Sequence, residues 1–187
     1  MKGNPLYQPS EDSFLLSDVL KKHLAKLLIP NPNLTFLEIG TGTGIHLETA
    51  LDIGVKKENI FSSDIDSRAV DHCNLLGFNC IQSDLFKNLK GTYDIIAFNP
   101  PYLPLDKREP IDSRLATTGG KRGDEIILKF LQQAKNYLNP NGIIFIVASS
   151  LTPDIDFKKF GYIEREVGCQ RLFHETLCVW ELALMQK

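Results

Sequence analysis

The chain has 187 residues, 43% of them hydrophobic and 24% charged, which is enough apolar material for the core of one globular domain. A formal net charge of −2 excludes a protein that wraps nucleic acid by overall electrostatic attraction. No window has the length and apolar content of a membrane span, and the N-terminus lacks a signal-peptide pattern, so we expect a cytoplasmic protein with no membrane partner.

The first expected element is a helix over residues 10–28. Ser10 is placed to cap this helix, and the acidic Glu11 and Asp12 suit the positive end of its dipole. Leucines then recur at helical spacing as far as Leu27, which predicts one apolar face. We interpret the segment as an extra N-terminal helix on a single domain that spans residues 1–187.

Strands and helices alternate at short spacing through the rest of the chain. This alternation implies right-handed crossovers and a mainly parallel sheet, whose central strands are apolar on both faces. We therefore expect an α/β, Rossmann-like fold with a mainly parallel seven-stranded sheet, helices on both faces and an antiparallel last strand. The expected strands are residues 34–40, 59–66, 78–84, 93–99, 143–150, 162–167 and 176–184, and the expected later helices end near residues 53, 76 and 138.

The cysteines do not indicate a metal site. Cys73, Cys80, Cys169 and Cys178 include no C-x-x-C pair, so zinc ligation is not expected. All four stand among apolar neighbours, and we interpret them as small core residues of a protein in a reducing compartment.

A glycine-rich turn follows the first expected strand. Gly40, Gly42 and Gly44 allow a tight turn and let a ligand approach the backbone closely. The dinucleotide fingerprint has a further glycine where this chain has Ile45. Glu38, just before the turn, suits a ligand that carries an amine or a positive charge. The alternative is a purely structural turn between strand and helix.

Acidic residues also stand at the ends of the next two strands. Asp64 is placed to accept hydrogen bonds from ribose hydroxyls, and Asp84 could accept one from an adenine amino group. Each alone could be a cap or turn residue. The carboxyl ends of parallel strands meet at one edge of a sheet, where ligands bind. Together with Glu38, these residues imply an adenosine with a cationic, amino-acid-like tail, a description that S-adenosylmethionine fits.

The sequence Asn99-Pro100-Pro101-Tyr102 ends the strongly apolar fourth strand. Proline keeps this stretch stiff and extended. The Asn99 side-chain oxygen and the Pro100 carbonyl can accept the two N–H bonds of a planar nitrogen and orient its lone pair toward a methyl donor. Tyr102 can lie against the flat group. Catalysis would then be mostly positioning. The alternative is a proline-rich turn that merely stops the strand.

The stretch "LEIGTGTG" (residues 37–44) resembles the first motif of the class I S-adenosylmethionine-dependent methyltransferases, and the likeness spans nearly the whole chain. The resemblance implies S-adenosylmethionine as the cofactor, with the methionine part near the glycine turn, the ribose on Asp64 and the adenine near Asp84. The cofactor-binding residues expected on this basis are Tyr7, Pro9, Ser13, Glu38, Gly40, Thr41, Gly42, Asp64, Ile65, Asp84, Leu85 and Asn99.

The tetrapeptide resembles the N-P-P-Y signature of methyltransferases that act on planar nitrogens. These include adenine-N6 DNA enzymes, guanine-N2 RNA enzymes and release-factor glutamine enzymes. The stretches "YQPSEDSFLL", "TGGKRGDEIILKFL" and "RLFHETLCVWEL" resemble the HemK-type glutamine methyltransferases, in their short archaeal and eukaryotic branch. This resemblance implies N5-methylation of the glutamine in a Gly-Gly-Gln loop of a translation termination factor. It also implies a small zinc-binding activator protein as a partner.

Two further segments are candidates for substrate and partner contacts. Residues 103–122 form a polar connection of about twenty residues, which is long for a compact domain without a function. We expect a wall or lid that receives the glutamine; the alternative is a mobile solvated loop. The third strand should lie at a sheet edge, and "GFNCIQ" has few charges to guard it, so a partner could add a strand there.

Three other functions are alternatives. A nucleic-acid methyltransferase for adenine-N6 or guanine-N2 shares the tetrapeptide, but this chain has no target-recognition domain and no basic excess. A non-catalytic cofactor-binding subunit would not need an intact tetrapeptide. A nicotinamide-dependent oxidoreductase is disfavoured by Ile45 and by the lack of a substrate domain.

Overall fold

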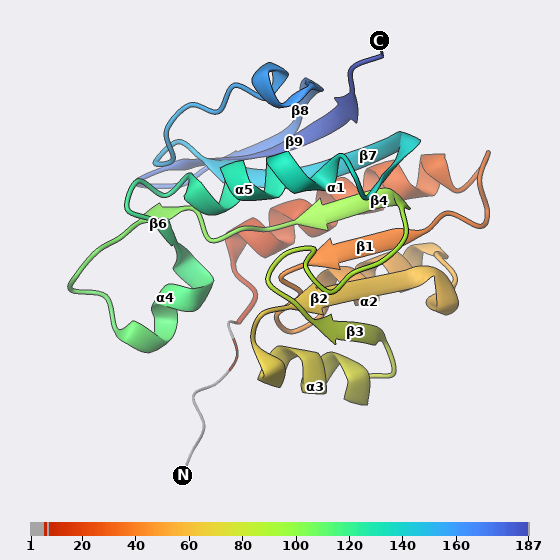
Figure 1. The fold of residues 1–187 in the computed structure, drawn as a ribbon, viewed down its shortest axis with the longest axis horizontal. Helices are drawn as coiled ribbons and strands as arrows, with labels where there is room; N and C mark the ends of the chain where they lie inside the picture. Colours follow the sequence, from red (N-terminus) through yellow and green to blue (C-terminus); the bar gives the residue numbers. More distant parts are fainter. Residues whose placement is uncertain (1–5, 7, 187) are drawn as a thin grey trace.

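Seven strands form one sheet in the order β3-β2-β1-β4-β7-β9-β8 (Figure 1). The structure is a computed structural model that describes residues 6 and 8–186. Strand β9 runs antiparallel to β7 and to β8, and the other neighbours pair in parallel, which confirms the expected sheet. The strands are β1 (Phe36–Ile39), β2 (Ile60–Asp64), β3 (Asn79–Gln82), β4 (Tyr93–Phe98), β7 (Leu138–Ser149), β8 (Tyr162–Arg171) and β9 (Thr176–Leu184).

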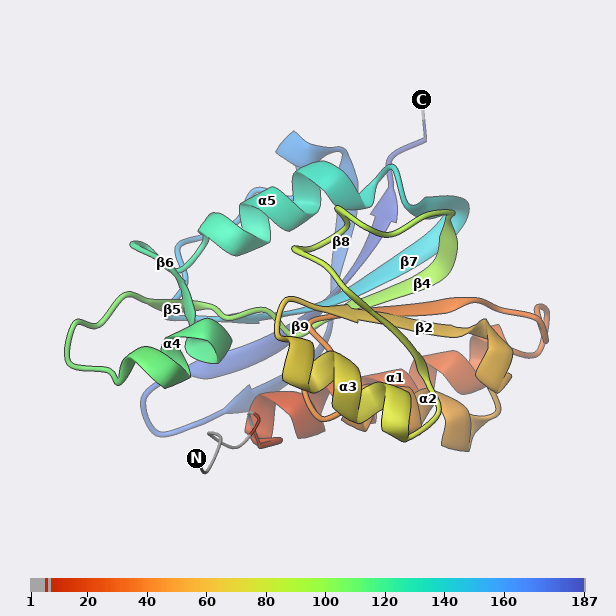
Figure 2. The same cartoon turned by 60° about the horizontal axis from the view of Figure 1, so that its bottom comes forward.

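Helices cover both faces of the sheet. Figure 2 shows α5 (Glu125–Ala134) on one face and α1 (Glu11–Leu27), α2 (Ile45–Ile53) and α3 (Ser67–Leu75) on the other. Apolar side chains of the sheet pack against each helical layer in a separate core cluster. Among the residues that the structure describes, no helix combines the length and the apolar character that crossing a bilayer requires.

Helix α1 packs directly on the sheet beside α2, so it completes one helical layer rather than adding a further one. It also touches β8 near the end of the chain: a Cβ added at Gly168 would lie 2.8 Å from Cγ2 of Val19. The expected cap by Ser10 does not form. The Ser10 hydroxyl instead bonds the carboxylate of its neighbour Glu11, and no side chain caps the helix.

The connection over residues 103–122 is structured, unlike the mobile solvated loop that was the alternative to a wall or lid. It contains β5 (Leu103–Pro104), α4 (Ile111–Thr117) and β6 (Thr118–Gly120), with β5 and β6 paired in parallel. The carboxylate of Glu109 holds this unit together by accepting hydrogen bonds from the hydroxyls of Ser113, Thr117 and Thr118. The sequence did not predict these short elements, because they depend on such contacts and carry no apolar periodicity.

The cysteine prediction was wrong for one pair. Cys169 and Cys178 stand opposite each other in the antiparallel β8–β9 pair, with Cα atoms 4.1 Å apart, and form a disulfide. Only Cys73 and Cys80 are buried thiols. Cross-strand neighbours are set by register, and the irregularity after Glu166 shifts that register. The cysteines therefore give no support to a reducing compartment.

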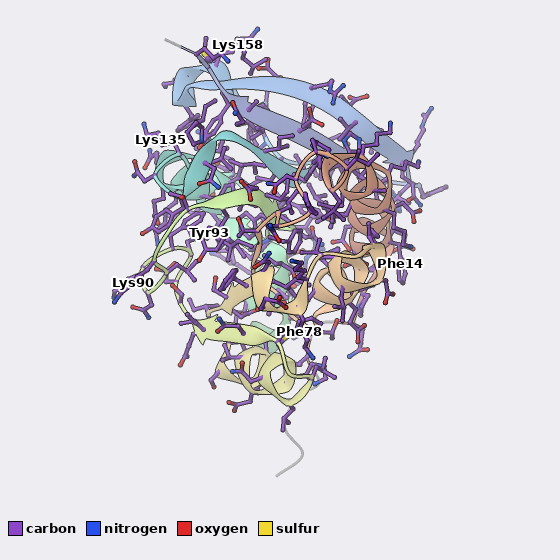
Figure 3. The ribbon with its side chains drawn as sticks, turned by 90° about the vertical axis from the view of Figure 1, so that its right-hand side faces the viewer. Phe14, Phe78, Lys90, Tyr93, Lys135 and Lys158 are labelled. Carbon is purple, nitrogen blue, oxygen red and sulfur yellow. A yellow bond between two sulfur atoms is a disulfide. The ribbon has the colours of Figure 1, made fainter. Side chains whose placement is uncertain are left out.

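Two features mark the end of the sheet at which β4 begins. Tyr93 donates its hydroxyl to the carbonyl of Lys90, and both residues are labelled in Figure 3. Residues 139–142, which precede the expected strand over residues 143–150, belong to β7, where the pairing with β4 is irregular. The opposite end of the sheet holds the carboxyl ends of β1 to β4.

Candidate active site

A cavity of about 640 Å³ lies at the carboxyl ends of β1, β2 and β4, and α4 and α5 contribute to its wall. Tyr7 lies outside the described residues. Tyr102 is not among the residues that line the cavity. The cavity brings together the other predicted site residues, which are Pro9, Ser13, Glu38, Gly40, Thr41, Gly42, Asp64, Ile65, Asp84, Leu85, Asn99, Pro100 and Pro101.

The glycine turn presents bare backbone to the cavity. Gly42 has a φ of +53°, and a Cβ added there would meet nothing within 4 Å. Asp64 fixes the turn, because its Oδ2 accepts the Gly42 N–H at 2.9 Å and its Oδ1 accepts the Asp66 N–H at 2.9 Å. Burial raises the pKa of Asp64. Each carboxylate oxygen keeps a lone pair for a ligand hydroxyl.

Glu38 is buried at the end of β1 and is not alone there. Its Oε1 lies 2.6 Å from Nδ1 of His46, and its Oε2 accepts the Thr41 hydroxyl at 2.9 Å. The other ring nitrogen of His46 lies 3.0 Å from the carbonyl of Ser13. Sequence reasoning missed His46, although its place as the second residue of α2, directly after the glycine turn, could have drawn attention to it.

The pH dependence of stability follows from His46. Burial opposes its charge, but the carboxylate of Glu38 and the hydrogen bonds to Glu38 and Ser13 raise the pKa of His46. The resulting stabilisation is complete below about pH 6.5, the ordinary histidine value, and is lost as pH rises through the higher folded-state pKa. We expect the free energy of unfolding to fall on the alkaline side of about pH 6.5, over the range in which His46 loses its charge.

Urea unfolding across this range tests the prediction. The His46→Gln variant should lose the decline, whereas His174→Gln, at an exposed position near the β8–β9 turn, should keep it. Wild-type stability that stays constant over the range would contradict the assignment.

Asn99 carries an unused acceptor at the cavity. Its Nδ2 lies 3.5 Å from the Ser13 hydroxyl, whereas its Oδ1 is buried and has no hydrogen-bond partner among the described residues. Buried polar atoms are nearly always paired, so an unpaired acceptor beside a cavity indicates a ligand that brings the donor. The sequence analysis assigned this oxygen to one N–H of a planar NH₂ group, and that role stays a prediction.

Tyr102 is held behind the site. Its hydroxyl donates to Oδ2 of Asp12 at 3.3 Å, its carbonyl accepts from Thr152 at 3.2 Å, and its ring packs against both core clusters. Contact between this ring and a substrate group stays a prediction. What the structure contains is an anchor for the tetrapeptide.

A pair of glycines packs backbone to backbone against the same stretch. A Cβ added at Gly119 would lie 2.6 Å from the carbonyl oxygen of Pro101, and one at Gly123 would lie 2.5 Å from that of Tyr102. The segment over residues 119–123 therefore braces the tetrapeptide, and only glycine leaves room for it. Both glycines stand in the stretch "TGGKRGDEIILKFL", but its resemblance did not predict what they contact.

At the far side of the cavity, Asp84 is paired with Lys129 of α5. The Lys129 Nζ lies 2.7 and 3.0 Å from the two carboxylate oxygens, and both side chains are about half exposed. The neighbouring Leu85 has a φ of +51°, which is rare for a residue other than glycine and is typical of functional sites. Asp84 can still accept a further hydrogen bond, but its carboxylate is already paired with Lys129.

Known proteins similar to this chain include methyltransferases. The model of the methyltransferase small domain family matches residues 15–170. The chain belongs to this family. A Methanocaldococcus jannaschii protein named as a candidate protein N5-glutamine methyltransferase is 41% identical to this methyltransferase over 155 residues, which are 79% of this chain and 74% of that one.

Two further relatives cover most of this methyltransferase. The eRF1 methyltransferase catalytic subunit mtq2 of Schizosaccharomyces pombe is 30% identical over 205 residues, covering 93% of this chain and 87% of that one. A solved structure of the E. cuniculi Mtq2-Trm112 complex, described as responsible for methylation of the eRF1 translation termination factor, has a TM-score of 0.70 at 24% identity. The match covers 95% of this chain and 98% of that one, and it confirms the fold.

Proposed function

We propose that this methyltransferase uses S-adenosylmethionine to methylate the side-chain nitrogen of a glutamine in a translation termination factor, and that it acts in the cytoplasm. The observation that carries the proposal is the buried, unpaired Oδ1 of Asn99 at the cavity. The names of the relatives support glutamine and a termination factor as the substrate class.

The cavity residues fit the cofactor. The glycine turn has no side chain at Gly42, so the methionine part of the cofactor can lie close to the backbone. Asp64 has lone pairs that can accept hydrogen bonds from the ribose hydroxyls, and Asp84 has one for the adenine amino group. When bound, S-adenosylmethionine supplies an electrophilic methyl group on a sulfonium. The Glu38 carboxylate is already paired with His46, so it gives the cavity a polar wall rather than an unpaired negative charge.

The chain's own part in the reaction is to hold an amide. The Asn99 Oδ1 accepts one amide N–H of the glutamine and the Pro100 carbonyl accepts the other, which turns the nitrogen lone pair toward the methyl group. Transfer forms an N–C bond and breaks the S–C bond, and the nitrogen loses one proton to solvent. Leu115, Ala116 and Thr117 of α4 line the cavity and form the wall for the incoming glutamine.

Transfer of labelled methyl groups to purified acceptors tests the proposal. The acceptors are a termination factor, the same factor with its Gly-Gly-Gln glutamine changed to leucine, and DNA. We expect label in the intact factor and none in the other two. Label in DNA alone would overturn the substrate in favour of a nucleic-acid methyltransferase.

The adenine end gives a separate prediction. Asp84→Ala should raise the dissociation constant of S-adenosylhomocysteine roughly 5- to 10-fold, because one hydrogen bond to a charged acceptor is lost. Lys129→Met should raise it less than about threefold, because an ion pair this exposed contributes little. Calorimetric titration of both variants measures the difference, and equal effects would place the adenine elsewhere.

We also propose that a small zinc-binding activator pairs with β3, which lies at a sheet edge as expected. The edge is not bare: the Asn74 side chain donates to the Cys80 carbonyl and accepts the Cys80 N–H, both at 3.1 Å. Asn88 likewise donates to the Gln82 carbonyl at 2.8 Å. A strand added by the partner would have to replace these hydrogen bonds. The side chains of Asn74 and Asn88 can rotate away from β3 without unfolding α3.

The two edges of the sheet provide a matched test of the partner. Ile81 on β3 and Ile163 on β8 are exposed isoleucines on opposite edge strands. We expect Ile81→Lys to abolish the heterodimer seen by native mass spectrometry of co-expressed proteins, and Ile163→Lys to leave it intact. Full activity of the chain without any partner would contradict an obligatory activator.

A further inference from the structure

A line of polar contacts runs from Glu38 to Asn99, and His46 is at its centre. The His46 ring is buried and lies between the end of β1 and the start of α1. It does not touch Asn99. The reaction as described above makes no use of it, yet it connects the cofactor end of the cavity to the residue that holds the substrate amide.

Both ring nitrogens of His46 face acceptors. Nδ1 lies 2.6 Å from a carboxylate oxygen of Glu38, and Nε2 lies 3.0 Å from the backbone carbonyl of Ser13. A carbonyl cannot donate, so Nε2 carries the proton of that hydrogen bond. Burial raises the pKa of Glu38, whereas the charge of His46 and the hydrogen bonds from His46 and Thr41 lower it, and an ionised Glu38 requires a proton on Nδ1 as well. The acidic groups around the ring are Glu38 on β1 and Asp12 on α1, with Asp64 of β2 beyond Glu38. This surrounding negative charge stabilises an imidazolium.

The bond to Ser13 matters because of what Ser13 then contacts. Its hydroxyl lies 3.5 Å from Nδ2 of Asn99, and it donates to Oδ1 of Asp12 at 3.2 Å. The other carboxylate oxygen of Asp12 accepts the Tyr102 hydroxyl. Holding the Ser13 backbone therefore holds α1 against both ends of the tetrapeptide. With Nδ2 directed at Ser13, the Asn99 amide can only present Oδ1 to the substrate.

We propose that His46 is a positioning residue for methyl transfer: as a donor on both sides of its ring, it ties Glu38 to Ser13 and thereby sets the orientation of the Asn99 amide. The inference rests on the proposed function for its kinetic consequence. The protonation of the His46 ring does not depend on the proposed function, so the positioning role and the proposed function can fail separately.

Nuclear magnetic resonance of the whole protein tests the two-sided donor without any reaction. Nitrogen-15 histidine spectra at neutral pH should show N–H protons on both ring nitrogens of His46, assigned by through-space contacts to Ser13. His174 serves as an exposed histidine control in the same sample. A ring protonated on only one nitrogen would overturn the proposal, whatever the enzyme methylates.

A double-mutant cycle tests the action through Ser13. His46→Gln should lower kcat at least tenfold, with the KM for the glutamine acceptor changed less than about threefold, because orientation rather than substrate contact is lost. When Ser13 is already alanine, His46→Gln should lower kcat less than about twofold. His174→Gln is the control and should leave both constants unchanged. Additive effects in the cycle would overturn the inference.

The outcomes separate the two proposals. A wild-type enzyme without transfer to glutamine refutes the proposed function, and the resonance experiment still decides whether His46 bridges Glu38 and Ser13. An active wild type with an additive cycle refutes only the positioning role. If His46→Gln does not fold, as a melting curve would show, His46→Asn replaces it in the cycle.

Discussion

Replacing Asn99 by alanine is expected to lower kcat by about three orders of magnitude while the dissociation constant of S-adenosylhomocysteine changes less than about threefold. The variant loses the unpaired Oδ1, which is the acceptor that orients the substrate nitrogen. Removing one positioned hydrogen-bonding group at a reacting centre costs about 10²- to 10³-fold in rate, and misorientation of the lone pair adds to this. The cofactor keeps the glycine turn, Asp64 and Asp84.

Radiometric transfer and calorimetric binding on the same preparation check this prediction. Asn99→Asp retains an acceptor oxygen and should keep more activity than Asn99→Ala. Asn141→Ala, at an exposed position in β7, is the control for loss of an asparagine. Its transfer rate and its affinity for S-adenosylhomocysteine should equal those of the wild type. A transfer rate within twofold of wild type for Asn99→Ala would refute the assigned role.

The second large effect is expected from Gly123→Ala. A Cβ at this position would lie 2.5 Å from the Tyr102 carbonyl oxygen and 3.0 Å from the Leu103 carbonyl carbon, which are backbone atoms that cannot rotate away. The tetrapeptide must shift. A displacement of about 1 Å at a reacting centre lowers the rate roughly 100-fold, and the strain should reduce the free energy of unfolding by about 2–3 kcal/mol.

Gly161→Ala is the matched control. Gly161 has a φ of +90°, close to the +94° of Gly123, but a Cβ there would meet nothing within 4 Å. Both variants therefore carry the same backbone strain, about 1 kcal/mol, and only Gly123→Ala presses on the tetrapeptide. We expect normal kcat for Gly161→Ala. Equal loss of activity in both variants would show that the glycine brace is not the cause.

Much of the architecture could be predicted because it depends on local pattern. Apolar strands, short spacing and the glycine turn were sufficient for the sheet, its helical layers and the edge that carries the cavity. The position of Asn99 followed from one stiff stretch at a strand end. These features arise from residues that are neighbours in the sequence, and parallel connectivity brings their ends together.

The predictions that failed or were missing depend on contacts between distant residues. The Cys169–Cys178 bond follows from a strand register that includes an irregularity, and α4 follows from hydroxyls gathered around Glu109. The contact of His46 with Ser13 joins residues 33 positions apart. No periodicity encodes such pairs, so the partner of a candidate residue was harder to predict than the residue itself.

The docking of α1 couples the cavity to the far edge of the sheet. Its first turn supplies Asp12 and Ser13 to the reaction chamber, while Val19 rests on Gly168 of β8. Helix α1 also packs on α2, β7 and β9, so the placement of these two cavity residues depends on elements that are far apart in the chain. We expect removal of β8 and β9 to loosen Asp12 and Ser13 at the cavity even though the Asn99–Tyr102 stretch is kept.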